Sequence, residues 1–130
     1  MNTFGRMRYT QLVAKSMEDR RAEPRFPETE PVLVTILDGS NRAYRGLTLD
    51  IAETGLSFAI AGVIEEGKPL RIELAEAVVL GEARYCRVLV DHPREYAVGV
   101  SIEHVCFGWG RVYERAAAAS GAAVRASLIA

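Results

Sequence analysis

Two short clusters of polar residues have the types and spacing needed to bind an anionic ligand. Three arginines, Arg20, Arg21 and Arg25, fall within six residues ahead of the first strand-like run, and Asp50 and Gly55 follow later in the chain. A guanidinium can hold phosphate through its planar fork and can read the O6/N7 edge of guanine. A carboxylate can accept hydrogen bonds from guanine N–H groups. Together the two clusters predict a ligand that is both anionic and guanine-bearing.

Each cluster also has a purely structural interpretation. The arginines can form a solvated basic turn, because charged runs usually face water, although Pro24 stiffens this one. In the second cluster, Asp50 can accept backbone N–H groups of a turn while Gly55 supplies a positive φ angle. Neither cluster is specific alone, so the functional prediction depends on their combination and order.

Other kinds of chemistry find no support in the sequence. His92 and His104 lie 12 residues apart and lack the spacing of a metal site. No nucleophile with an adjacent base can be assembled, and no glycine-rich phosphate loop is present. We therefore expect neither an enzyme nor a bound metal or cofactor. Cys86 and Cys106 lie in apolar surroundings and are expected to be reduced cysteines of the core.

Length and charge indicate one globular domain with an uneven charge distribution. The chain has 130 residues and a formal net charge of -1, which gives no global field favouring nucleic acid or an anionic membrane. Residues 26–105 carry 7 basic and 13 acidic side chains, whereas both ends are basic. No apolar run reaches the roughly 20 residues of a membrane span, and Arg6 and Arg8 interrupt the apolar core that a signal peptide needs. We expect a cytoplasmic protein without membrane insertion.

The elements that must position the two clusters are mostly strands. In the second strand-like segment, alternation places Thr48 and Asp50 on one face and Leu47 and Leu49 on the other. A bend or bulge is expected at Gly81. Short connections without helices between the strands predict an all-β antiparallel barrel or sandwich. The six predicted strand segments span residues 32–37, 43–50, 56–60, 70–74, 78–90 and 96–103.

Helices are predicted only near the two ends. The alanine-rich stretch 111–120 has high helix propensity, Gly121 is expected to end or break this helix, and residues 124–129 can extend it. Loose helical spacing of apolar residues predicts a further short helix within residues 1–19. Three aromatic residues are expected to pin the C-terminal helix against the end of the barrel: Phe107, Trp109 and Tyr113.

The order of the motifs resembles a known family. Arg21-x-x-x-Arg25, then a strand, then Asp50-x-Ala52-x-x-Gly55, is similar to the RxxxR and [D/N]xSxxG motifs of the PilZ domain. The resemblance covers residues 19–115, which leaves residues 1–18 as an N-terminal extension and residues 116–130 as a C-terminal helical tail. It implies an all-β fold, a six-stranded antiparallel barrel followed by a C-terminal α-helix.

The resemblance also implies a function, a receptor that binds the bacterial second messenger cyclic di-GMP and relays it to a partner protein. By analogy, Arg21 and Arg25 would clasp phosphate and the Hoogsteen edge of guanine, Asp50 would hydrogen-bond a guanine, and Gly55 would allow the close turn. The arginine segment would be mobile without ligand and fold over it. Arg20 precedes the RxxxR motif and implies a stacked ligand dimer, because its guanidinium can lie against an additional guanine.

One residue departs from the family pattern, since Ala52 stands where the family has serine. Losing one neutral hydrogen bond costs about 0.5–1.5 kcal/mol, whereas an arginine–guanine fork contributes about 1–3 kcal/mol. The substitution is therefore expected to weaken binding by about tenfold without abolishing it, provided that no buried partner is left unpaired. Ser57 points elsewhere in an alternating strand and is not expected to compensate.

Two other functions compete with this interpretation. Ala52 favours a degenerate PilZ-like adaptor that binds only protein, through the region of Trp109 or the C-terminal helix. A small barrel that binds nucleic acid would need aromatic stacking platforms in a basic groove. The strand region here is acidic, so DNA and RNA partners are not expected.

Overall fold

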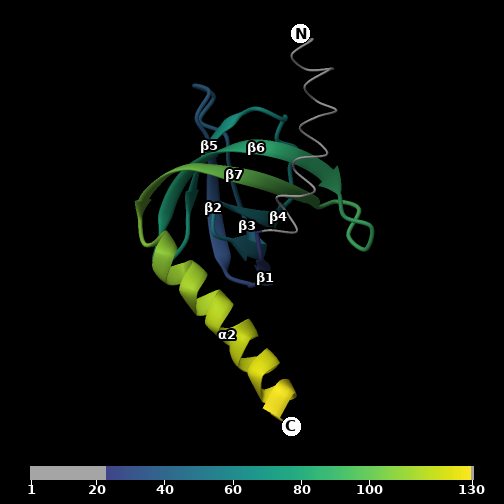
Figure 1. Ribbon diagram of the computed structural model, residues 1–130. Helices are drawn as coiled ribbons and strands as arrows, with labels where there is room; N and C mark the ends of the chain where they lie inside the picture. Colours follow the sequence, from purple (N-terminus) through teal and green to yellow (C-terminus); the bar gives the residue numbers. More distant parts are fainter. Residues whose placement is uncertain (1–22, 130) are drawn as a thin grey trace, which may run out of the picture.

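The computed structural model describes residues 23–129, with side chains described for residues 23–121. Seven strands and one helix make up this part of the chain, and every strand pairing is antiparallel (Figure 1). The predicted helix within residues 1–19 falls outside the described residues, as do Arg20 and Arg21. The elements are β1 (Arg25–Pro27), β2 (Pro31–Ile36), β3 (Ala43–Ala52), β4 (Gly55–Ile60), β5 (Pro69–Glu73), β6 (Val78–Val88), β7 (Tyr96–Phe107) and α2 (Trp109–Ile129).

Six of the strands close into a barrel, as the sequence predicted. The pairing order runs β3-β2-β5-β6-β7-β4, and a further pairing of β4 with β3 completes the circle. Each of the six predicted segments corresponds to one barrel strand, and the predicted irregularity at Gly81 of β6 is present as a register shift after Leu80. The all-β six-stranded barrel with a C-terminal helix is confirmed.

The strand β1 is an addition that the sequence analysis missed. It pairs with residues 50–52 of β3, on the same edge of β3 whose residues 43–47 pair with β2. Thr48 connects the two short ladders, because its hydroxyl donates to Glu28 O and accepts from Glu30 N. Three residues are too few for a periodic pattern, and Pro27 is not typical of a strand interior.

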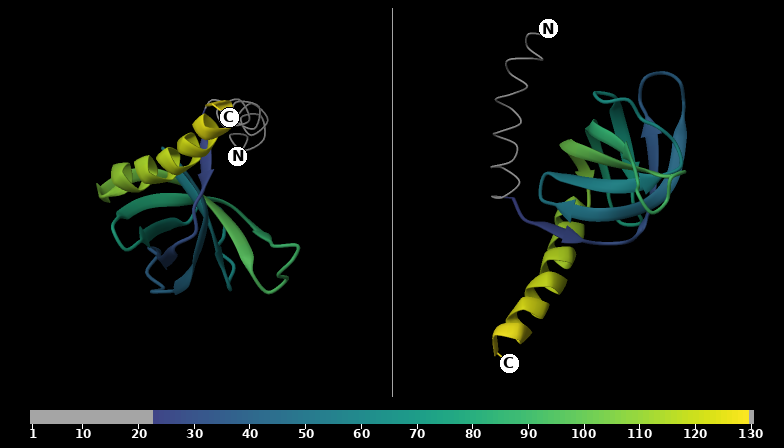
Figure 2. Two further views of the ribbon diagram at one scale, coloured as in Figure 1. Left: turned by 90° about the horizontal axis from the view of Figure 1, so that it is seen from below. Right: turned by 90° about the vertical axis from the view of Figure 1, so that its right-hand side faces the viewer.

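The helix α2 begins directly after β7 and runs on past the barrel (Figures 1 and 2). Gly108, at φ 81°, makes the turn between them, in contact with the backbone at Glu76. The expectation that Gly121 ends or breaks this helix was wrong, because α2 is continuous from Trp109 to Ile129. A helical glycine costs only about 1 kcal/mol relative to alanine, and the surrounding alanines favour the helix. Among the described residues, no helix is long and apolar enough to cross a membrane.

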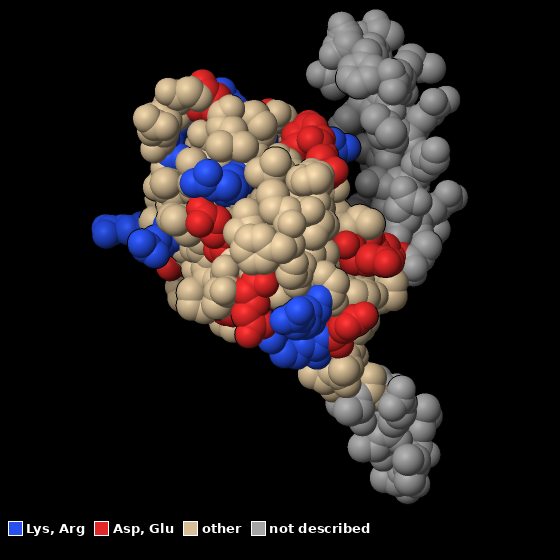
Figure 3. All heavy atoms as spheres, turned by 90° about the vertical axis from the view of Figure 1, so that its left-hand side faces the viewer, with Lys and Arg blue, Asp and Glu red and all other residues tan. Residues whose placement is uncertain are grey.

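Ion pairs as well as apolar contacts hold the base of α2 on the barrel. Arg115 lies 2.6 Å from a carboxylate oxygen of Glu76 and 3.7 Å from one of Glu30. Figure 3 shows acidic and basic side chains side by side where α2 leaves the barrel. Next to Arg115 on the helix surface, Val112 and Ala116 are fully buried and join the barrel core. The base of α2 is therefore part of the folded domain.

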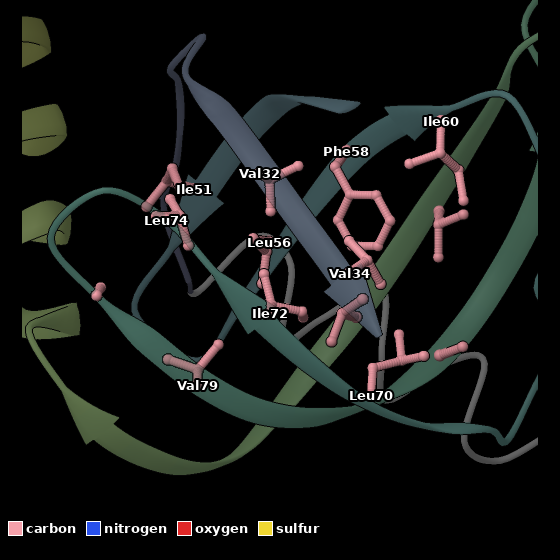
Figure 4. Close-up of a cluster of buried hydrophobic side chains, with 14 of the residues drawn as sticks. Val32, Val34, Ile51, Leu56, Phe58, Ile60, Leu70, Ile72, Leu74 and Val79 are labelled. Atoms are coloured by element: carbon pink, nitrogen blue, oxygen red, sulfur yellow. The ribbon is translucent and has the colours of Figure 1, made fainter. Parts of the chain in front are cut away.

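The core consists mainly of the inward-facing residues of the six barrel strands, joined by buried residues of α2 and of the loops (Figure 4). The alternation that predicted these strands also selects the core, as in β2, where every second residue is buried. Branched aliphatic side chains dominate because they pack well on a pleated surface. Phe58 is the one buried phenylalanine among the described residues. The labelled members are Val32, Val34, Ile51, Leu56, Phe58, Ile60, Leu70, Ile72, Leu74 and Val79.

A bulge in β3 changes which face its last residues occupy. The register between β3 and β4 shifts between Thr48 and Asp50, so that strict alternation is interrupted. Ile51 is fully buried in the core, and Asp50 therefore lies on the outer face. The prediction that Asp50 shares a face with Thr48 was wrong for this reason. The bulge is what presents the Asp50 carboxylate on the barrel surface.

Candidate ligand-binding site

The two polar clusters of the sequence meet where β1 pairs with β3. Arg25 is directly opposite Ala52 in the ladder, and its side chain reaches diagonally to Asp50. The guanidinium donates to one oxygen of Asp50, with Nη2 at 2.7 Å and Nε at 3.1 Å. The side chains are 29% and 35% exposed, so the pair lies at the surface within reach of a ligand. Arg25 and Asp50 were both predicted site residues, and the structure brings them together.

A second contact joins the arginine segment to the turn that follows β3. The carboxylate of Glu23 accepts a hydrogen bond from Thr54 N at 2.8 Å, and the Thr54 hydroxyl donates to the same oxygen. Sequence reasoning missed both residues because it treated the spacers of the two motifs as neutral. A carboxylate in the first motif and a hydroxyl in the second were the signal that could have found them.

The helix α2 supplies a third contact to the same turn. The indole N–H of Trp109 donates to Ala52 O at 3.2 Å and to Glu53 O at 3.0 Å. Trp109 is 3% exposed, which agrees with the prediction that it pins the helix against the barrel. Tyr113 contributes through a tilted contact with Phe26, at 5.8 Å between ring centroids. The same role for Phe107 was wrong, since this side chain is 57% exposed.

Gly55 and Ala52 have roles that differ from their sequence interpretation. Gly55 is buried at the start of β4, and the described residues with a positive φ angle do not include it. A Cβ at this position would lie 2.7 Å from Val100 O, so the glycine is needed for close approach of β4 to β7. Ala52 is fully buried on the same face as Asp50 and opposite Arg25. Its methyl group therefore lies beside Arg25 on the same face of the ladder.

Two predicted site residues, Arg20 and Arg21, lie outside the described residues. Within residues 23–129 the site is built by three elements, namely β1 with the residues before it, the β3–β4 turn, and the first two turns of α2. Their contacts present a guanidinium with N–H donors next to a carboxylate with acceptor oxygens. Such a pair of groups can hold a ligand that carries anionic oxygen and both donors and acceptors on a planar edge. The residues involved are Glu23, Arg25, Phe26, Asp50, Ala52, Thr54, Gly55, Trp109 and Tyr113.

Ionisable groups outside this site form two further clusters. Burial raises the pKa of Glu30, and the nearby Arg115 offsets only part of this effect. One carboxylate oxygen of Glu30 is buried and has no hydrogen-bond partner among the described residues. At the opposite end of the barrel, hydrogen bonds from Ser40 and Lys68 lower the pKa of Asp38. The first cluster attaches α2 to the barrel, and the second attaches the β2–β3 turn to the residues before β5. Neither cluster includes Arg25 or Asp50.

The histidines and cysteines form no site among the residues that the structure describes. No group of three or more His, Cys, Asp or Glu side chains in that part of the chain is arranged to hold a metal ion. Both cysteines are free thiols, Cys86 partly buried and Cys106 exposed. The expectation of a core position was therefore wrong for Cys106. It lies near the end of β7, beyond the last pairing with β4 at Ser101, where the strand pairs only with β6.

Comparisons with known proteins agree with this fold. The family model of the PilZ domain matches residues 19–105. Among solved structures, the chain is similar to the inhibitor of motility MotI/DgrA of Bacillus subtilis, with 13% identity and a TM-score of 0.54 over 67% of this chain and 44% of that chain. The chain thus spans less than half the length of MotI/DgrA, and at this identity the likeness concerns the fold. It is also similar to the PilZ domain of YcgR from Escherichia coli, a structure with c-di-GMP, at 15% identity and a TM-score of 0.48, over 75% of this chain and 86% of that chain. No curated protein matches the chain.

Proposed function

Because the chain belongs to the PilZ domain family, we propose that it is a receptor that binds cyclic di-GMP and relays the signal to a partner protein. The observation that carries the proposal is the contact between Arg25 and Asp50. These residues are 25 positions apart in the sequence and belong to the two motifs, yet their side chains meet on the barrel surface. The proposed role is that of a non-enzymatic cytoplasmic adaptor.

The chemistry of the pair suits a guanine base joined to phosphate. Arg25 offers N–H donors for the O6 and N7 acceptors of guanine or for phosphate oxygens. Asp50 offers acceptor oxygens for the N–H groups of guanine. One of its two oxygens already accepts from Arg25, and no described residue hydrogen-bonds to the other. Guanine can therefore bind beside the pair without breaking it.

The arginines before Glu23 complete the proposed site. Arg21 would clasp phosphate or the Hoogsteen edge of guanine, and Arg20 would lie against a second, stacked ligand molecule. Residues 23–27 are attached to β3 and the β3–β4 turn. The proposed folding of the arginine segment over the ligand therefore concerns residues before Glu23. We propose that the chain has three parts: an extension of residues 1–18, a domain of residues 19–115 and a tail of residues 116–130.

Titration calorimetry of the Arg25→Ala variant with cyclic di-GMP tests the proposed site. Loss of one arginine fork is expected to lower affinity by about 5- to 150-fold. Arg71→Ala is the matched control, because Arg71 also forms a surface ion pair, with Glu73 at 3.0 Å, but lies on β5. If both variants bind as tightly as the unmodified chain, Arg25 does not contact the ligand and the proposed site is wrong.

A second proposed function is that of an adaptor that binds a partner protein but no nucleotide. Ala52 supports it because the family's serine is absent at a position within the site. In that case Arg21→Ala leaves partner binding intact, whereas changes in α2 or at Trp109 abolish it. A pull-down of the same partner with both sets of variants separates the two functions.

A further inference from the structure

The β3–β4 turn is held from two sides by different parts of the chain. On one side Glu23, from the arginine segment, accepts from Thr54 N and Oγ1. On the other side Trp109, the first residue of α2, donates its single indole N–H to the carbonyls of Ala52 and Glu53. Three consecutive turn residues thus have their backbone polar groups fixed by the arginine segment and by the helix. The position of this turn depends on both.

A second path connects the same elements without passing through the turn. Phe26 follows Arg25 in β1, and its ring contacts Tyr113, one helical turn beyond Trp109. Trp109 and Tyr113 both lie in the first two turns of α2. The same two turns carry Val112 and Ala116, whose side chains are buried in the barrel core. Figure 2 shows β1 passing the base of the helix. The base of α2 therefore contacts both β1, which carries Arg25, and the β3–β4 turn, which follows Asp50.

We propose that Trp109 is a positioning residue for the ligand site and that it couples ligand binding to the docking of α2. This inference rests on the proposed function and names how that site is regulated and read out. If the base of α2 separates from the barrel, the carbonyls of Ala52 and Glu53 lose their donor and the turn next to Asp50 is released. A ligand that binds only the assembled site must then oppose this separation.

The direction of the coupling follows from the contacts that coexist. The Arg25–Asp50 pair, the Glu23–Thr54 contact and the Trp109 hydrogen bonds are all formed together in one structure. The docked helix and the formed site are therefore compatible, and ligand binding stabilises both. Beyond Ala116, α2 extends away from the barrel by about 1.5 Å per residue (Figure 1). A partner that contacts this part of α2 can sense whether its base is docked.

Hydrogen exchange of the α2 backbone amides, with and without cyclic di-GMP, tests the coupling. At a ligand concentration about 100 times the Kd, exchange at residues 112–116 is expected to slow by up to about 100-fold. Amides of β5, on the other side of the barrel, serve as the internal reference for global stabilisation. Calorimetric binding with unchanged or faster exchange in α2 overturns the coupling and leaves the proposed function intact. Absence of calorimetric binding to the unmodified chain overturns both.

The role of the indole N–H can be isolated because the chain contains one tryptophan. Biosynthetic replacement of Trp109 by benzothienylalanine keeps the shape of the ring and removes only the N–H donor. Affinity for cyclic di-GMP is expected to fall by about two- to tenfold, the effect of one lost hydrogen bond, at a temperature where circular dichroism shows both proteins folded. If this replacement, and also Trp109→Phe, leaves both the affinity and the α2 exchange response unchanged, Trp109 is not a positioning residue.

Discussion

At the scale of single residues, one ion pair carries the functional account. Arg25 and Asp50 were chosen from the sequence because their types suit guanine and phosphate, and the structure places their charged atoms 2.7 Å apart. The carboxylate of Glu23 and the hydroxyl of Thr54 are visible in the two motif spacers, but spacing alone does not show that these side chains meet across 31 residues. Arg20 and Arg21 lie outside the described residues and remain predictions from the family resemblance.

The Arg25→Ala variant should separate folding from binding. Both side chains of the pair are about one-third exposed, and ion pairs at such positions contribute at most about 1 kcal/mol to stability. We therefore expect a urea midpoint close to that of the unmodified chain together with a clear loss of affinity for cyclic di-GMP. A large fall in the midpoint would show that Arg25 is mainly a structural residue of β1.

The Ala52→Ser variant tests the departure from the family motif. Ala52 faces the same side as Asp50 and lies opposite Arg25 in the ladder, so an added hydroxyl would lie next to the Arg25–Asp50 pair. We expect calorimetry with cyclic di-GMP to show an affinity that is unchanged or raised by up to about tenfold. A reduced affinity would mean that the added hydroxyl is buried without a partner and that the alanine is required in this chain.

At the scale of elements, alternation and turn residues predicted the barrel, and local irregularities explain the differences. Periodicity of two found all six barrel strands, because each has one face in the core. The same rule misplaced Asp50, because one extra residue between Thr48 and Asp50 reverses the faces. It also missed β1, which has three residues and depends on pairing with β3 rather than on its own pattern.

Gly55 offers a test of how closely β4 approaches β7. Gly55→Ala places a Cβ 2.7 Å from Val100 O, so the strands must separate, and the free energy of unfolding is expected to fall by about 1–3 kcal/mol. Gly110→Ala is the matched control, since a Cβ there meets no atom within 4 Å and alanine favours the helix by up to about 1 kcal/mol. Equal urea midpoints for the two variants would contradict this packing.

At the scale of the whole molecule, ion pairs between acidic groups of the barrel and a basic group of α2 attach the helix to the barrel. The acidic middle of the sequence was predicted to disfavour nucleic acid, but its structural use was not apparent from the sequence. Glu30 and Glu76 both lie near Arg115, and this contact attaches α2 to the barrel. It depends on the tertiary fold, since Arg115 and Glu30 are far apart in the chain.

Glu30 should make stability depend on pH. Burial raises its pKa above the ordinary value of 4.5, so the folded state keeps a proton that the unfolded chain releases. The contribution of Glu30 to stability is therefore highest below about pH 4.5 and is lost as pH rises through the raised pKa. The neutral side chain of Glu30→Gln does not lose this stability as pH rises. The variant's gain in free energy of unfolding over the unmodified chain, measured with urea, should therefore be larger at about pH 7 than at about pH 4. A gain that is the same at both values, or larger at the lower one, would contradict the assignment.

The central claim is that this barrel binds cyclic di-GMP at the surface where β1 meets β3. Titration calorimetry of the purified chain at low salt, paired with thermal unfolding, tests it most directly. We expect saturable heat of binding and a melting temperature that rises with ligand concentration, because a ligand that binds only the folded state stabilises it. No heat and no thermal shift at about 100 μM ligand, a concentration that would reveal even micromolar affinity, would contradict the claim.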